Sequence, residues 1–150
     1  MHSLRKKILF FGGLILINTP AIAEDELVIS CGSSKGYAYY HEGGYVPAEK
    51  SGFTDDTISQ GSIKVTLSDK GEWDVTQLDA TQTQKSAREQ GASIVKFGGN
   101  IDGITIIVNY PGSAHEIYVL RPLTNELIWY RTTYDVKVNK SSIYHAKCIY

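Results

Sequence analysis

The chain has 150 residues and is nearly neutral, with 15 lysines and arginines against 16 aspartates and glutamates. This balance excludes the strongly basic surface that is typical of nucleic-acid-binding domains, and the length excludes a multidomain machine. We therefore expect one globular domain with no nucleic-acid partner.

Residues 1–23 have the layout of a cleavable secretory signal. Three basic residues at 5–7 precede the apolar run 8–17, and the segment ends in an Ala-Ile-Ala motif at 21–23. An apolar run of this length is too short for a membrane span, which needs about 20 residues. We predict a signal peptide followed by one β-rich domain at 24–150, which is periplasmic or secreted and has no membrane span after signal removal.

Two cysteines, Cys31 and Cys148, lie near the two ends of this domain. After export into an oxidising compartment, they can pair within the chain only with each other. The alternative is a cysteine nucleophile with His41 or His145 as its base. We predict the disulfide, which requires the first and last strands to lie side by side.

Strand patterns dominate the domain. In 61–67 the apolar residues Ile63, Val65 and Leu67 alternate with polar ones, which is typical of a half-buried strand. The links between such segments are short and rich in turn residues, which favours antiparallel neighbours. The predicted strands, in chain order, are 26–31, 61–67, 73–78, 92–97, 104–110, 115–121, 127–134 and 142–150.

Two segments depart from this pattern. Residues 79–90 are compatible with a short surface helix that has a capping box at Thr81 and Gln84, although almost no apolar face is available. Residues 32–61 hold six of the 14 glycines and are expected to be mostly irregular. The fold class is therefore all-β, or β-rich α+β, with a single twisted antiparallel sheet or barrel of about seven to nine strands and at most one short helix.

A tyrosine-rich segment is the predicted binding surface. It contains Tyr37, Tyr39, Tyr40, His41 and Tyr45 beside several glycines. Tyrosines offer flat faces and a hydroxyl group at little entropic cost, which suits contact with a protein or a glycan of the cell envelope. The alternative is structural, because aromatic side chains also favour ordinary pleated sheets.

Enzymatic chemistry has weaker support. A small hydrolase or metal-dependent enzyme would be centred on His41 and Glu42, but no pair of residues has metal-ligand spacing. The adjacent carboxylates Asp55 and Asp56 would point to opposite faces of an extended chain, and we expect a solvated turn at 52–56. We assign no catalytic residue, no metal site and no cofactor, and we favour an exported binding or interaction module over an enzyme.

Four segments resemble a group of small exported proteobacterial proteins. The first is the motif Cys-Gly-Ser-Ser-x-Gly-Tyr-Ala-Tyr-Tyr at 31–40, and the others are 52–56, 79–81 and 110–112. The resemblance extends over most of the domain. It implies export, and it brings no activity, substrate or catalytic residue with it.

Overall fold

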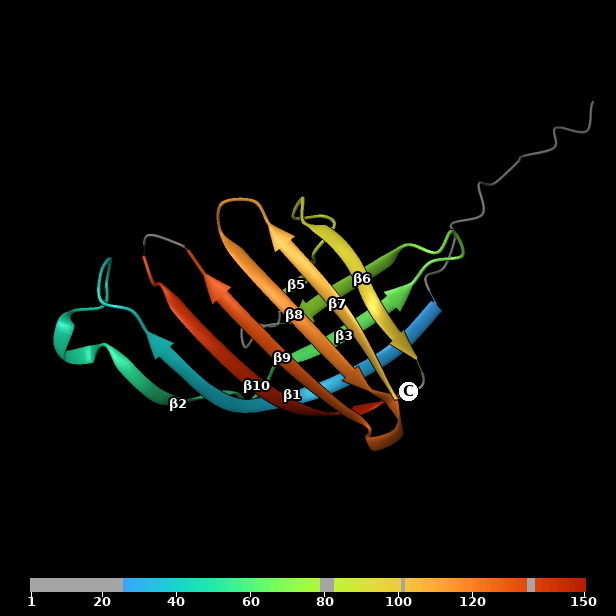
Figure 1. Ribbon diagram of the computed structural model, residues 1–150, viewed down its shortest axis with the longest axis horizontal. Helices are drawn as coiled ribbons and strands as arrows, with labels where there is room; N and C mark the ends of the chain where they lie inside the picture. The colour runs from blue at the N-terminus through green and yellow to red at the C-terminus, as the bar shows by residue number, and fades with distance from the viewer. Residues whose placement is uncertain (1–25, 79–82, 101, 135–136) are drawn as a thin grey trace, which may run out of the picture.

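The computed structural model describes residues 26–78, 83–100, 102–134 and 137–150, so the predicted signal peptide and the first residues of the predicted helix lie outside the described residues. Within these ranges the chain forms ten strands and two single-turn 3-10 segments (Figure 1). The bounds are β1 Glu26–Tyr40, η1 Ala48–Lys50, β2 Gly52–Ile58, β3 Ser62–Leu67, β4 Trp73–Leu78, β5 Gln84–Ser86, β6 Ser93–Asn100, β7 Gly103–Tyr110, β8 Ala114–Arg121, η2 Pro122–Thr124, β9 Glu126–Thr133 and β10 Lys140–Ile149. No described helix is long and apolar enough to cross a bilayer.

All the strands belong to one antiparallel sheet. A continuous path of nine strands runs β5-β4-β3-β1-β10-β9-β8-β7-β6, and β2 pairs with β1 outside this path. The sheet curls into a half-barrel, with β3 to β5 (green) crossing behind β6 to β9 (Figure 1). The two ends of the sheet approach each other: the Lys96 ammonium of β6 lies 5.7 Å from the ring centroid of Trp73 on β4. The predicted single antiparallel sheet is confirmed.

The first and last strands are joined covalently. Strand β1 pairs with β10 along most of its length, and Cys31 lies directly opposite Cys148 in that ladder. The two residues form a disulfide across 117 positions of sequence. Both the predicted bond and the predicted pairing of the terminal strands are confirmed.

Strand β1 is longer than predicted and changes partner along one edge. Its first part pairs with β3, and its second part, from Ser34 to Tyr40, pairs with β2. The prediction that 32–61 is mostly irregular, with a solvated turn at 52–56, is therefore wrong. The glycines of this segment favoured an irregular structure. In the fold, however, Gly36 is needed because β10 passes very close, and a Cβ atom at this position would lie 1.9 Å from the Ile143 carbonyl oxygen.

The predicted helix at 79–90 is also wrong for the residues that are described. Residues Gln84–Ser86 form the short strand β5 on the edge of β4. Directly after it Ala87 is fully buried, and its N–H donates to the Val75 carbonyl oxygen at 2.9 Å. A helix in this segment would have no apolar face to bury, whereas an added edge strand needs only backbone hydrogen bonds and one small buried side chain.

The concave face of the half-barrel changes from apolar to polar along the strands. Successive cross-strand rows on β8, β9 and β10 contain only apolar side chains, then aromatic side chains, and then charged or hydroxyl-bearing side chains. These rows are Leu120–Leu127–Ala146, Tyr118–Trp129–Tyr144 and Glu116–Arg131–Ser142. The polar groups therefore gather at one end of the concave face.

Candidate functional site: a basic basin on the concave face

A basin with a volume of about 380 Å³ opens at this polar end. Its lining comes from strands that lie far apart in the sequence. It includes Gln77 of β4, Lys85 of β5, Tyr110 of β7, Arg131 and Thr133 of β9, and Lys140 of β10. The described residues that line the basin include three basic side chains and no acidic one, so its wall is positively charged.

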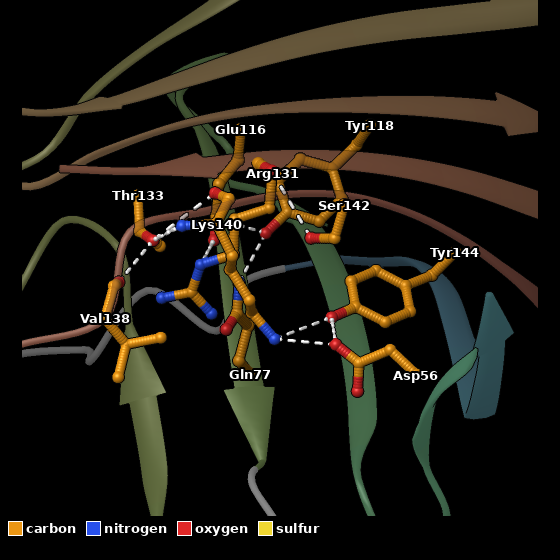
Figure 2. Close-up of polar contacts among 10 residues, drawn as sticks. All are labelled: Asp56, Gln77, Glu116, Tyr118, Arg131, Thr133, Val138, Lys140, Ser142 and Tyr144. Carbon is orange, nitrogen blue, oxygen red and sulfur yellow. Dashed lines mark hydrogen bonds and ion pairs between the residues drawn. The ribbon is translucent and has the colours of Figure 1, made fainter. Parts of the chain in front are cut away.

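The side chain of Glu116 is completely buried beneath the basin. One carboxylate oxygen lies 3.2 Å from the Arg131 Nε atom, and the other accepts a hydrogen bond from Gln77 Nε2 at 2.9 Å (Figure 2). The Tyr118 hydroxyl donates to that second oxygen as well. The second oxygen of Glu116 therefore has two hydrogen-bond donors, whereas the first oxygen and the Arg131 Nε atom form an ion pair without a hydrogen bond.

The two tyrosines near this carboxylate remain protonated. Burial, followed by the nearby Glu116 charge, raises the pKa of Tyr118 well above 10. Burial and the same carboxylate also raise the pKa of Tyr110 far above its ordinary value. Both hydroxyl groups are therefore hydrogen-bond donors at neutral pH, and neither is a tyrosinate base or nucleophile.

Arg131 forms the floor of the basin. Its Nε side faces Glu116, and its guanidinium carbon lies 6.0 Å from the ring centroid of Trp129. No described residue accepts a hydrogen bond from its two terminal nitrogens, and about a third of the side chain is exposed to solvent. The outer edge of the guanidinium is therefore available to a ligand.

Lys140 belongs to a second charged group at the rim. Its Nζ atom donates to Asp56 Oδ2 at 2.7 Å and to the Tyr144 hydroxyl at 3.1 Å, and Tyr144 donates to the same Asp56 oxygen at 2.6 Å (Figure 2). Burial alone would raise the pKa of Asp56, but these two donors outweigh burial and hold that pKa below its usual value. Asp56 therefore stays ionised and compensates the charge of Lys140.

Lys85 has no ion-pair partner among the described residues. Arg131 is compensated by Glu116, and Lys140 by Asp56. Among the described residues that line the basin, one positive charge is thus left without a counterion. This arrangement suits a small anion that enters from solvent.

The predicted binding residues do not share one surface. Tyr37 and Tyr39 point to the convex face of the sheet and are exposed, and the Tyr39 ring lies 5.0 Å from His41 and 4.9 Å from Phe53. Tyr37 continues into an apolar row that crosses the convex face from strand to strand. The row consists of Tyr37, Ile143, Tyr130, Ile117, Ile107 and Val95.

Tyr40 and Tyr45 lie away from that group. The Tyr40 ring is half-buried, with the Lys140 ammonium 5.5 Å from its centroid. Tyr45 is largely exposed and, together with Tyr40, lines a separate hollow that also includes Lys50. The structure therefore divides the predicted tyrosine surface into two parts.

His41 and Glu42, the residues of the alternative enzyme hypothesis, are exposed. The His41 Nε2 atom lies 3.2 Å from the Ser141 hydroxyl oxygen. The described part of the chain contains no group of three or more histidine, cysteine, aspartate or glutamate side chains that could hold a metal ion.

Sequence reasoning missed the residues that build the basin. One signal was present: Glu116 occupies the same strand face as the apolar residues Ala114, Tyr118 and Leu120, so an alternating strand had to bury a charge. Its partner Arg131 could not be identified without the register between β8 and β9. Comparison with protein-family models, curated proteins and solved structures gives no match for this chain.

Proposed function

We propose that this protein is an exported binding module and that the basin on its concave face holds a small anionic ligand. The observation that carries the proposal is the basic lining of the basin, which includes Arg131, Lys140 and Lys85 and no described acidic side chain. A concave site with a few convergent polar groups is the usual form of a small-molecule site. The disulfide and the signal-like sequence of residues 1–23 support export to an oxidising compartment.

Calorimetric titration of the oxidised domain with acetate, sulfate and phosphate at low ionic strength tests the proposal. Added salt should weaken binding, and Lys85→Gln should lower the affinity about threefold to fivefold, which corresponds to roughly 1 kcal/mol for one exposed charge. Lys64→Gln is the matched control, because Lys64 is an exposed lysine of β3 outside the basin. Absence of binding for every anion, including the sugar acid tested below, would disprove the proposal.

The apolar row of the convex face favours a second candidate role, in which the protein binds an envelope protein. Contiguous exposed apolar side chains on a monomer mark interaction surfaces. Tyr37, Tyr130 and Val95 of this row are 61%, 42% and 55% exposed. A Tyr37→Ser/Tyr130→Ser variant should stay folded and lose its partner in cross-linking from intact cells, and an unchanged cross-linking pattern would exclude this role.

A further inference from the structure

We infer that the ligand of the basin is a hydroxylated monocarboxylate, with the chemistry of a sugar acid, and that its carboxylate group binds the outer edge of Arg131. This inference rests on the proposed function, since it names the class of anion that the same basin takes. Three features of the basin support it: the orientation of one guanidinium, the balance of charge, and the polar groups around the floor.

The orientation of Arg131 favours an anion that presents two oxygens side by side, as a carboxylate does. Glu116 lies against Nε, so the edge that carries the two terminal nitrogens faces away from the protein carboxylate (Figure 2). Two parallel N–H groups match the two oxygens of a carboxylate, and this bidentate pairing is geometrically specific. The guanidinium can therefore hold Glu116 on one edge and the carboxylate of a ligand on another.

Glu116 acts as a positioning residue for this contact. Its side chain is wholly buried, and Gln77 and Tyr118 both donate to the oxygen that is not beside Arg131. The donors hold the Glu116 carboxylate in place, and Arg131 is oriented by its ion pair with the other carboxylate oxygen and by the neighbouring Trp129 ring. The basin thus offers a preorganised donor pair, which lowers the entropic cost of binding a matching anion.

The charge balance favours a monoanion. Two of the three basic groups already have protein carboxylates as partners, and Lys85 alone has none among the described residues. A carboxylate neutralises that single excess charge, whereas a phosphate monoester near neutral pH carries almost two negative charges. A doubly charged ligand would leave one negative charge uncompensated, close to Glu116 and Asp56.

The remaining lining favours a ligand that carries hydroxyl groups. The amides of Gln77 and Gln90 and the hydroxyls of Tyr110 and Ser113 surround the floor, whereas only Ala114 and Val138 are apolar. The Nε2 groups of Gln77 and Gln90 already donate to protein oxygens, and the Tyr110 hydroxyl is hydrogen-bonded to Glu116. The two amide oxygens and the Ser113 hydroxyl of the lining can still bind hydroxyl groups of a ligand, which favours a hydroxylated ligand over an apolar one.

Calorimetry with four probes at one ionic strength tests the inference. D-glucuronate has both the carboxylate and the hydroxyl groups, D-glucose lacks the carboxylate, acetate lacks the hydroxyl groups, and glucose 6-phosphate replaces the carboxylate with a dianion. We expect glucuronate to bind at least tenfold more tightly than each of the other three. Arg131→Lys keeps the positive charge beside Glu116 but removes the pair of terminal N–H groups. It should weaken glucuronate binding at least tenfold, and acetate, which has the same carboxylate group, should also bind more weakly.

Other outcomes would overturn the inference. Equal or tighter binding of glucose 6-phosphate or acetate would reject the sugar-acid class and leave the proposed anion site intact. Unchanged glucuronate affinity in Arg131→Lys would reject the bidentate contact. Failure of every anion to bind would remove both proposals, and a thermal melt of each variant shows that it is folded. If Arg131→Lys does not fold, the ranking of the four probes on the wild-type protein still decides the ligand class.

Discussion

Gly36 of β1 lies directly opposite Tyr144 of β10, and a methyl group at Gly36 would come within 1.9 Å of the carbonyl oxygen of Ile143. The obstacle is backbone, so it cannot move aside as a flexible side chain would. Gly36→Ala should therefore force the two central strands apart and destabilise the fold by about 3 kcal/mol or more. Gly32→Ala is the control on the same strand, because no atom lies within 4 Å of its added methyl group. Urea unfolding compares the two variants, and equal midpoints would contradict the close approach.

Truncation of a buried tyrosine should destabilise the fold far more than truncation of an exposed one. Tyr144 is 2% exposed and packs against Trp129, with ring centroids 4.8 Å apart, so Tyr144→Ala should cost about 3–5 kcal/mol. Tyr37 is on the convex face, and its truncation should change stability by no more than about 0.5 kcal/mol. Equilibrium denaturation gives both values. A large loss for Tyr37→Ala would mean that the convex row contributes to the stability of the fold rather than to an interaction surface.

Local patterns predicted most of this fold because a strand with one buried face repeats every two residues. The observed strand Trp73–Leu78 has the predicted bounds, and the alternation through Ile63 and Val65 marks β3. The pattern failed in the second half of β1, where Ser34, Gly36 and Ala38 take the inward positions. Small residues in these positions give no apolar signal, although at Gly36 a small residue is required because the backbone of β10 passes very close.

The basin could not be predicted in the same way, because its charged pairs are not local. Asp56 and Lys140 lie 84 residues apart, and they meet only because β1 holds β2 on one edge and β10 on the other. The predicted turn at 52–56 is a strand, in which Asp55 and Asp56 lie on opposite faces, and no local pattern showed which face would contain a cation. The tyrosine-rich segment attracted attention because it is continuous in sequence, whereas the basin draws single residues from several strands.

Removal of the arginine that faces the buried carboxylate should be costly. Arg131→Ala leaves Glu116 buried without its cation, and we expect a loss of about 3 kcal/mol in the free energy of unfolding. The double variant Arg131→Ala/Glu116→Gln should recover part of that loss, since no uncompensated charge remains. Lys85→Ala is the control, because this exposed lysine lines the same basin. Urea denaturation of all three variants measures these losses. An Arg131→Ala variant as stable as Lys85→Ala would show that Arg131 does not stabilise the buried Glu116 carboxylate.

The disulfide should contribute strongly to stability because it closes a long loop. With 117 positions between Cys31 and Cys148, the constraint on the unfolded chain is worth about 4–5 kcal/mol in the chain-entropy model. The Cys31→Ala/Cys148→Ala variant should lose most of this amount in guanidinium titrations. Reduction of the wild-type protein should give a similar shift, and a shift below about 1 kcal/mol in both experiments would contradict the expectation.

Asp56 should make the stability of the fold depend on pH in the acid range. Its pKa is lower in the folded protein than the ordinary value of 3.8, because the donors Lys140 and Tyr144 outweigh the effect of burial. As the pH falls below about 4, the unfolded chain takes up a proton before the folded one does, so this contribution to stability is present above that pH and is lost through the lower, folded pKa.

Asp56→Asn should therefore be less stable than the wild-type protein by about 2 kcal/mol at pH 7, and the difference should shrink as the pH falls through the lowered pKa of Asp56. The stability of both the wild type and Asp56→Asn should still depend on acid pH through Glu126, because hydrogen bonds, the strongest of them from Lys147, lower the pKa of Glu126 to about 2. Asp55→Asn is the matched control, since Asp55 is exposed on the opposite face of the same strand. Chemical denaturation at pH steps from 2 to 7 measures the three curves. A difference between Asp56→Asn and wild type that stays constant over this range would show that Asp56 has no lowered pKa in the folded protein.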